Sequence, residues 1–215
     1  MRTVNDEAIA NGSKETWKEL NRIHGIRVYI IHLKRPGMDI KFDRNNGKIT
    51  WEYNGKKINI IKSNVLYAFE HGNNKVMVKE RIEGHSSFSL YDETGVLIFD
   101  YQSNSKELHT NSGCISVDLE KIISADYDEI QNVLVILEGN GTDNILSLYE
   151  NSGKKQGTIS QPKELRFISL SNDKGRVDVS CRGLDAKYVD SFGRNDWCFE
   201  IDYESLNIKS GHVIE

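Results

Sequence analysis

The residues best suited to covalent chemistry lie in one short segment, His109 to Ser116, which reads His-Thr-Asn-Ser-Gly-Cys-Ile-Ser. Cys114 follows a glycine there, and His109 precedes it by a few residues. A cysteine thiolate attacks acyl carbonyls, and a nearby histidine can take its proton. The segment therefore holds the residue types of a cysteine-dependent acyl-transfer site.

The run Ser112-Gly113-Cys114-Ile115 resembles the nucleophile loop of L,D-transpeptidases, and this resemblance implies acyl transfer through Cys114. The chain departs from the family pattern at two positions. Ser112 stands where the family has a histidine, and Ser116 stands where it has an arginine. The other interpretation is a glycine turn followed by a buried strand cysteine. We keep the enzyme only as an alternative.

Metal and cofactor motifs are missing from the rest of the sequence. The other histidines (His24, His32, His71, His85 and His212) do not share metal-ligand spacing with a second histidine or cysteine. The segment starting at Asp43 partly matches a calcium loop. Its glycine, Gly47, is the fifth residue, whereas a calcium loop requires a glycine at the sixth position. Nucleotide-binding and serine-hydrolase motifs are also missing. We expect no catalytic residue, no cofactor and no metal.

Two segments are candidates for binding a partner protein. Asp126-Tyr127-Asp128-Glu129 has the composition of a solvated turn between two strands; as a binding segment it could accept a lysine or arginine of the partner, with Tyr127 as an anchor. Phe192 and Arg194 precede the alternating residues Trp197, Phe199 and Ile201, which we expect in the core. Phe192 and Arg194 lie in a loop and can be exposed.

The elements that position these residues are short strands joined by a recurring turn. An aromatic residue, an acid and a glycine recur, with glycines at 47, 95 and 153, and Ile201 to Asn207 is a weaker copy. Strand patterns recur every ten or so residues, and Asn46-Gly47, Asn54-Gly55 and Asn140-Gly141 favour hairpins. The sequence predicts an all-β chain of antiparallel meanders in a propeller-like array, with a sandwich or barrel as the alternative.

One helix is expected near the N-terminus. Ser13 can cap it, Trp17, Leu20 and Ile23 would form its apolar stripe, and Gly25 would end it. We therefore divide the chain into a segment of residues 1–25, with this helix packed on the β domain, and a single all-β domain of residues 26–215.

Composition limits the classes of partner. The chain has 215 residues, 38% of them hydrophobic, and a net charge of −4. A modest negative charge disfavours direct nucleic-acid binding. The longest apolar run is too short to span a bilayer, and three cysteines without a CxxC motif suggest reduced thiols. We expect a cytoplasmic protein that does not contact a membrane.

The C-terminal stretch from Ser191 to Glu204 resembles the tails of small bacterial proteins, some of them similar to immunity proteins paired with toxins. The resemblance implies a cytoplasmic protein that covers the active site of one cognate toxin, for example a basic nuclease domain. The function expected from the sequence is therefore a non-enzymatic protein-binding module. A general propeller-like interaction scaffold and the Cys114 enzyme are the alternatives.

Overall fold

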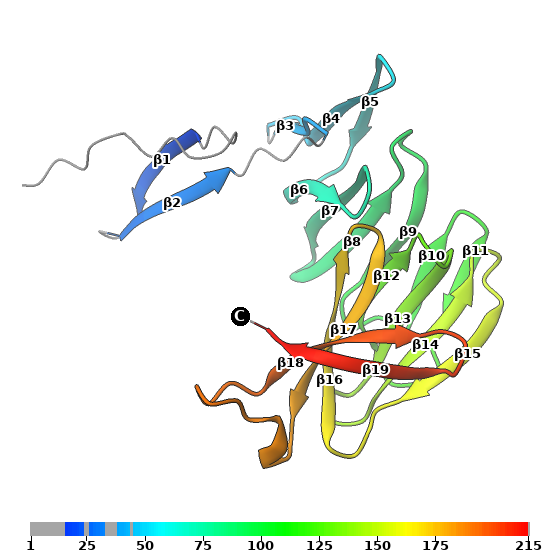
Figure 1. Cartoon of the computed structure of the whole chain (residues 1–215). Coiled ribbons are helices and arrows are strands. Elements are labelled where there is room, and N and C mark those ends of the chain that lie inside the picture. The colour runs from blue at the N-terminus through cyan, green and yellow to red at the C-terminus, as the bar shows by residue number, and fades with distance from the viewer. Residues whose placement is uncertain (1–15, 24–25, 33–37, 44, 215) are drawn as a thin grey trace, which may run out of the picture. The chain divides into compact units, whose positions relative to one another are not determined.

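The computed structural model describes residues 16–23, 26–32, 38–43 and 45–214 (Figure 1). The chain divides into two compact units, Met1–Gly37 and Met38–Glu215. The described residues are mainly strands, and their one helical element is the three-residue 3₁₀ turn η1, Ala186–Tyr188. This part of the chain contains no helix with the length and hydropathy of a membrane span.

The first unit contains a hairpin where we expected a helix. Strands β1 (Thr16–Ile23) and β2 (Ile26–His32) pair antiparallel, with Trp17 opposite Ile31. The prediction of a helix is therefore wrong for residues 16–23, while Ser13 and Gly25 lie outside the described residues. A helix this short is marginal in isolation, whereas the β-branched run after it offers a complete antiparallel partner. The hairpin also places residues 26–32 in the first unit, although we had assigned them to the β domain.

The second unit contains four antiparallel sheets, each with its strands in sequence order. The first sheet comprises β3 (Lys41–Asp43), β4 (Lys48–Tyr53) and β5 (Lys56–Ile61). The second comprises β6 (Val65–His71), β7 (Lys75–Ile82), β8 (His85–Tyr91), β9 (Leu97–Gln102), β10 (Glu107–Thr110) and β11 (Gly113–Ser116). The third comprises β12 (Ile122–Asp128), β13 (Val133–Gly139), β14 (Asn144–Glu150) and β15 (Lys155–Ser160). The fourth comprises β16 (Leu165–Asp173), β17 (Arg176–Gly183), β18 (Asp196–Asp202) and β19 (Asn207–Val213).

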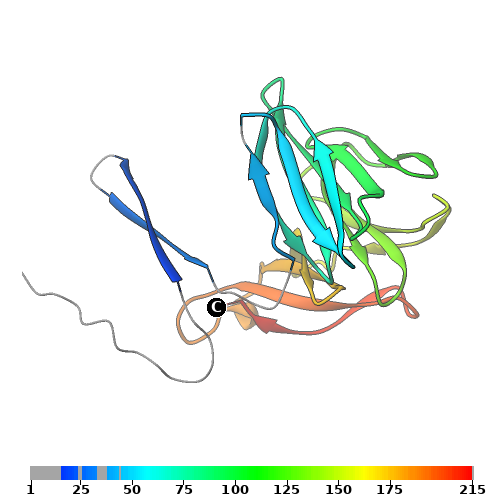
Figure 2. The same cartoon turned by 90° about the horizontal axis from the view of Figure 1, so that it is seen from above.

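Successive sheets of this unit pack on one another through three apolar clusters, and the views in Figures 1 and 2 follow this order. Strand β13 shows the principle. Val133, Val135 and Leu137 point into the cluster shared with the fourth sheet, while Leu134 and Ile136 point into the cluster shared with the second. Successive side chains of a strand point to opposite faces of the sheet, so a sheet that is apolar on both faces can contribute to two hydrophobic cores. The expected all-β class and meander order are confirmed, and the described sheets do not close into a barrel.

The recurring acid-glycine turn has the structural role that we expected. In the turn between β8 and β9, the Asp92 carboxylate accepts hydrogen bonds from the amides of Thr94 and Val96, both at 2.9 Å. Gly95 has a φ of +88°, and Tyr91 is buried in the core. A carboxylate that accepts amide protons fixes the turn, and glycine accommodates the left-handed backbone.

The weaker copy between β18 and β19 differs in one detail. Asp202 accepts hydrogen bonds from the amides of Glu204 and Ser205, as the repeat requires. The left-handed position falls on Leu206, with a φ of +51°, and not on Asn207, the last residue of this copy.

Candidate functional site

The acidic segment Asp126 to Glu129 is not a solvated turn, because most of it belongs to β12. The side chains of Asp126 and Asp128 are buried, and those of Tyr127 and Glu129 are half-buried. The structure therefore brings the four predicted residues together but turns two of the three carboxylates inward. The segment is buried and not a solvated turn because the antiparallel pairing of β12 with β13 extends through Asp128.

Asp126 joins strands from three sheets. Its carboxylate lies 2.8 Å from His71 Nε2 of β6, and its Oδ1 accepts a hydrogen bond from Asn172 Nδ2 of β16 at 3.2 Å. The Tyr127 amide donates to the same oxygen at 2.7 Å. A buried carboxylate with this many donors is stabilised inside the fold, so Asp126 acts as a junction between sheets.

Asp128 makes a second connection, to the fourth sheet. Its Oδ2 accepts hydrogen bonds from the Val177 amide at 2.9 Å and from Tyr203 Oη at 2.7 Å, while Oδ1 accepts from the Gln131 amide at 2.9 Å. Burial, together with the negative charge of Asp128, raises the pKa of Tyr203 well above its usual range. The phenol therefore stays protonated and remains a donor.

Glu129 and Tyr127 also have partners within the chain. Glu129 lies 2.9 Å from Lys75 Nζ and accepts a hydrogen bond from the Asn73 amide at 2.9 Å. Tyr127 Oη donates to Asn132, and Lys75 Nζ lies 5.8 Å from the centroid of the Tyr127 ring. These contacts occupy the charged groups that we expected to receive a partner's cation.

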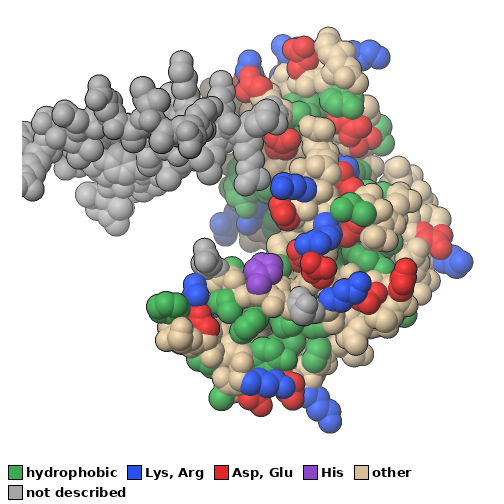
Figure 3. All heavy atoms as spheres, viewed as in Figure 1, with side chains coloured by type: hydrophobic (Ala, Val, Ile, Leu, Met, Phe, Trp, Pro, Cys, Tyr) green, Lys and Arg blue, Asp and Glu red, His purple; other side chains and the backbone are tan. Residues whose placement is uncertain are grey.

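The loop between β17 and β18, residues 184–195, has the exposed residues that the acidic segment lacks. Phe192 has 82% of its surface exposed, Leu184 has 51% and Val189 has 48%. In Figure 1 the loop extends from the lower left of the fourth sheet. Figure 3 shows hydrophobic side chains at the surface over this sheet. The expectation that Phe192 is exposed is confirmed, and Arg194 is exposed as well.

Asp190 braces the turn from Asp190 to Arg194 within this loop. Its Oδ1 accepts hydrogen bonds from the amides of Phe192 and Arg194, both at 2.8 Å, and its Oδ2 accepts from Arg194 Nε at 2.7 Å. Desolvation opposes ionisation of Asp190, but these hydrogen bonds outweigh it and lower the pKa of the carboxyl. The Arg194 guanidinium lies 5.3 Å from the Phe192 ring centroid. The exposed aromatic therefore stands on a braced turn.

The same turn recurs here in a copy that sequence reasoning missed. The Asp190 amide donates to Arg194 O, and the Gly193 amide donates to Asp190 O, with Gly193 at a φ of +81°. Asp92 and Gly95 make the same pair of backbone hydrogen bonds. Val189 stands where the three copies with glycines at 47, 95 and 153 have an aromatic residue, so the match is not visible in the aromatic pattern. The signal that remains is an acid followed three positions later by glycine.

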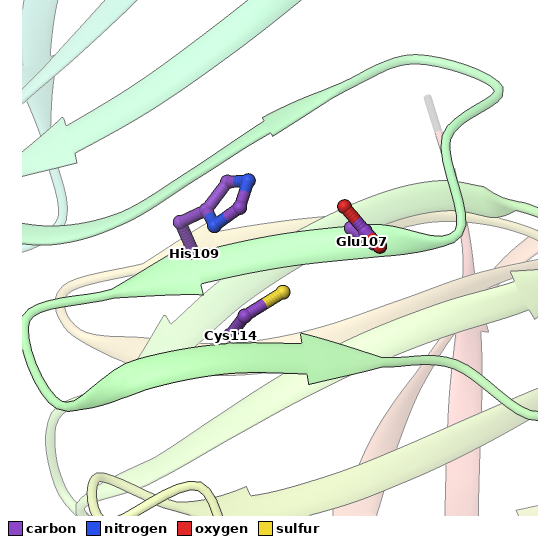
Figure 4. A group of neighbouring side chains, drawn as sticks. All are labelled: Glu107, His109 and Cys114. Carbon is purple, nitrogen blue, oxygen red and sulfur yellow. The ribbon is translucent and has the colours of Figure 1, made fainter.

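Cys114 is exposed on the edge strand β11, so the expectation of a buried strand cysteine is wrong. The turn before it reverses the chain, and His109 lies directly opposite in the register. Figure 4 shows both side chains with Glu107. Slight desolvation and the charge of Glu107 raise the pKa of the Cys114 thiol. A protonated thiol is a poor nucleophile, so this direction of the pKa gives no support to the acyl-transfer alternative.

No known family model and no curated protein sequence matches this chain.

Proposed function

We propose that this protein is a non-enzymatic protein-binding module whose β17–β18 loop is the main contact surface. The observation that carries this proposal is the exposure of Phe192 on a turn braced by Asp190. Aromatic side chains supply much of the binding energy in protein interfaces when they enter a pocket of the partner. A turn already fixed before binding loses little conformational entropy. Leu184 and Val189 provide apolar surface in the same loop.

The partner that we propose is a cognate bacterial toxin with a basic active-site face, and the protein acts as its cytoplasmic immunity protein. The resemblance of residues 191–204 to the tails of small bacterial proteins, some of them similar to immunity proteins, and the net charge of −4 support this choice. Inhibition requires only that the bound protein covers the toxin's active site. Nucleic acid and membrane are not part of the proposed interface.

The test is a binding measurement with the protein encoded by the neighbouring gene. Wild-type protein should form a 1:1 complex with it and suppress its toxicity in co-expressing cells. Phe192→Ala should weaken binding by at least about tenfold, because truncating an anchor residue costs about 2 kcal/mol or more and a tenfold loss needs only about 1.4 kcal/mol.

Ile61→Ala is the matched control, since Ile61 is 77% exposed but belongs to β5. It should bind like the wild type. If the wild type, Phe192→Ala and Ile61→Ala all bound the neighbouring protein with equal affinity, the loop would not be part of the interface. Failure of the wild type to bind the neighbouring protein, together with capture of several unrelated proteins, would favour the interaction scaffold.

A further inference from the structure

Three side chains of different chemistry converge at the end of the second sheet. His109 of β10 pairs directly with Cys114 of β11, and Glu107 precedes His109 by two residues on the same face of β10. A carboxylate oxygen, an imidazole nitrogen and the Cys114 sulfur all lie within 4.8 Å of one another. Figure 4 shows the three side chains rising from the same side of the hairpin.

The three groups are free to bind something else. Within the described part of the chain, their side chains make no hydrogen bond and no ion pair, and all three residues are exposed. Other titratable groups in the second sheet are often paired, for example Glu80 of β7 with Lys62 at 2.9 Å. An exposed carboxylate, imidazole and thiol without internal partners can all turn toward one ligand.

The hairpin fixes the positions from which these side chains start. Thr110 Oγ1 donates to Gly113 O at 3.1 Å and accepts from the Ser112 amide at 3.1 Å. These contacts hold the turn between the two strands and thereby the register of His109 and Cys114. Ligands on paired strands are held more accurately than ligands on a free loop.

We propose that Glu107, His109 and Cys114 form a binding site for Zn²⁺ or a closely similar borderline divalent cation. Sulfur, imidazole nitrogen and carboxylate oxygen are the three ligand types that zinc takes in proteins, whereas Mg²⁺ and Ca²⁺ require oxygen ligands. Ligand atoms around a tetrahedral zinc are roughly 3.5 Å apart, so small side-chain rotations close the present spacing.

Three protein ligands leave one coordination position for water or for a group of another molecule. Glu107, His109 and Cys114 are all exposed, so this position is accessible to solvent. The site shares no residue with the β17–β18 loop. Zinc binding is therefore independent of the proposed toxin binding, and either proposal can fail without the other.

The experiment uses the full-length protein, with any affinity tag removed and metals stripped with a chelator. Titration with Co²⁺ should produce the near-ultraviolet absorption of a thiolate-to-cobalt charge transfer at a 1:1 ratio, and Zn²⁺ should displace it. Calorimetry with Zn²⁺ alone gives the affinity. Cys114→Ser should abolish the charge-transfer band, and His109→Ala and Glu107→Gln should each weaken Zn²⁺ binding by about tenfold or more.

His85→Ala and Cys198→Ser are the matched controls, because they remove an exposed histidine and a different thiol from the same chain. Both should retain wild-type affinity. A band that persists in Cys114→Ser, or an equal loss in the controls, would overturn the site. The absence of a 1:1 transition with either metal would also overturn it.

A second readout does not depend on the spectrum. Bound Zn²⁺ should protect Cys114 from iodoacetamide, and addition of a chelator should restore labelling, as measured by mass spectrometry of the Cys114 peptide. His109→Ala should lose this protection at the same Zn²⁺ concentration. An unchanged labelling rate in the wild type at saturating Zn²⁺ would contradict the proposal.

Discussion

His71 Nε2 lies 2.8 Å from Asp126 Oδ2 and joins two sheets through residues 55 positions apart. Both side chains are largely buried, and Asn172 of the fourth sheet donates to the same carboxylate. Three successive sheets thus meet at one acid. Because a buried carboxylate is costly without donors, this arrangement links the packing of the sheets to specific polar contacts.

Replacing the acid should therefore destabilise the whole unit. Asp126→Asn preserves the shape but removes the charge and one acceptor oxygen, and we expect a loss of about 1–3 kcal/mol in the free energy of unfolding. Urea denaturation measures it. Asp143→Asn is the control, because Asp143 is exposed and its side chain contacts no described residue through a hydrogen bond or ion pair. Equal stability of the two variants would show that the junction contributes little.

The repeated turn gives a second prediction, on backbone strain. A methyl group at Gly95 would lie 2.7 Å from Ile58 Cγ2, whereas one at Gly55 would meet nothing within 4 Å. Both glycines have a positive φ. Gly55→Ala should cost about 1 kcal/mol from backbone strain alone. Gly95→Ala should cost about 1–3 kcal/mol more through overpacking, as thermal or urea unfolding would reveal.

The bracing of the β17–β18 loop should depend on the charge of Asp190. Asp190→Asn removes the ion pair with Arg194, which spans 2.7 Å. We expect trypsin to cleave after Arg194 several-fold faster in this variant, although its unfolding free energy changes little, because the loop opens locally. Affinity for the proposed partner should fall as well, since a mobile turn must be ordered on binding. An unchanged cleavage rate would contradict the bracing.

Acid should release the same loop in the wild type. The pKa of Asp190 is lowered in the folded protein, so ionisation stabilises the braced turn above the ordinary aspartate pKa of about 3.9. That stabilisation is lost as the pH falls through the lowered pKa. The amide protons of Phe192 and Arg194 donate to this carboxylate, so their NMR chemical shifts should titrate below about pH 3.9. A midpoint above that value would contradict the assignment.

Cys181 should report global unfolding. It is fully buried between β16 and β18, and burial raises the pKa of its thiol to about 12. A protonated thiol inside the core cannot reach an alkylating reagent. Pulse labelling with iodoacetamide should modify Cys181 only at urea concentrations where the circular dichroism signal is lost. Labelling well below the transition would reveal a local opening of the fourth sheet.

The sequence by itself determined the local features of the fold. The longest apolar run, Val133 to Leu137, indicated a strand, and the acids at Asp92 and Asp202 indicated turns. Both features depend on residues a few positions apart. Strands β10, β15 and β19 were not predicted because they bury few apolar residues, Leu108 alone in β10 and Ile159 alone in β15. Their pairing comes from the neighbouring strand and not from their own pattern.

Tertiary structure decided what depends on distant partners. From the sequence, Asp126 and Asp128 belong to a polar segment that is expected in solvent. Hydrogen bonds from His71, Asn172 and Tyr203, which are distant in the sequence, allow both carboxylates to be buried. Likewise, β2 provides the strand partner for Thr16–Ile23, a segment whose apolar spacing alone also fits a helix. Phe192 stayed exposed, as its loop position suggested, because Asp190 closes the turn beneath it. Whether a side chain is buried or exposed depends on hydrogen-bond partners and packing contacts that come from distant parts of the chain.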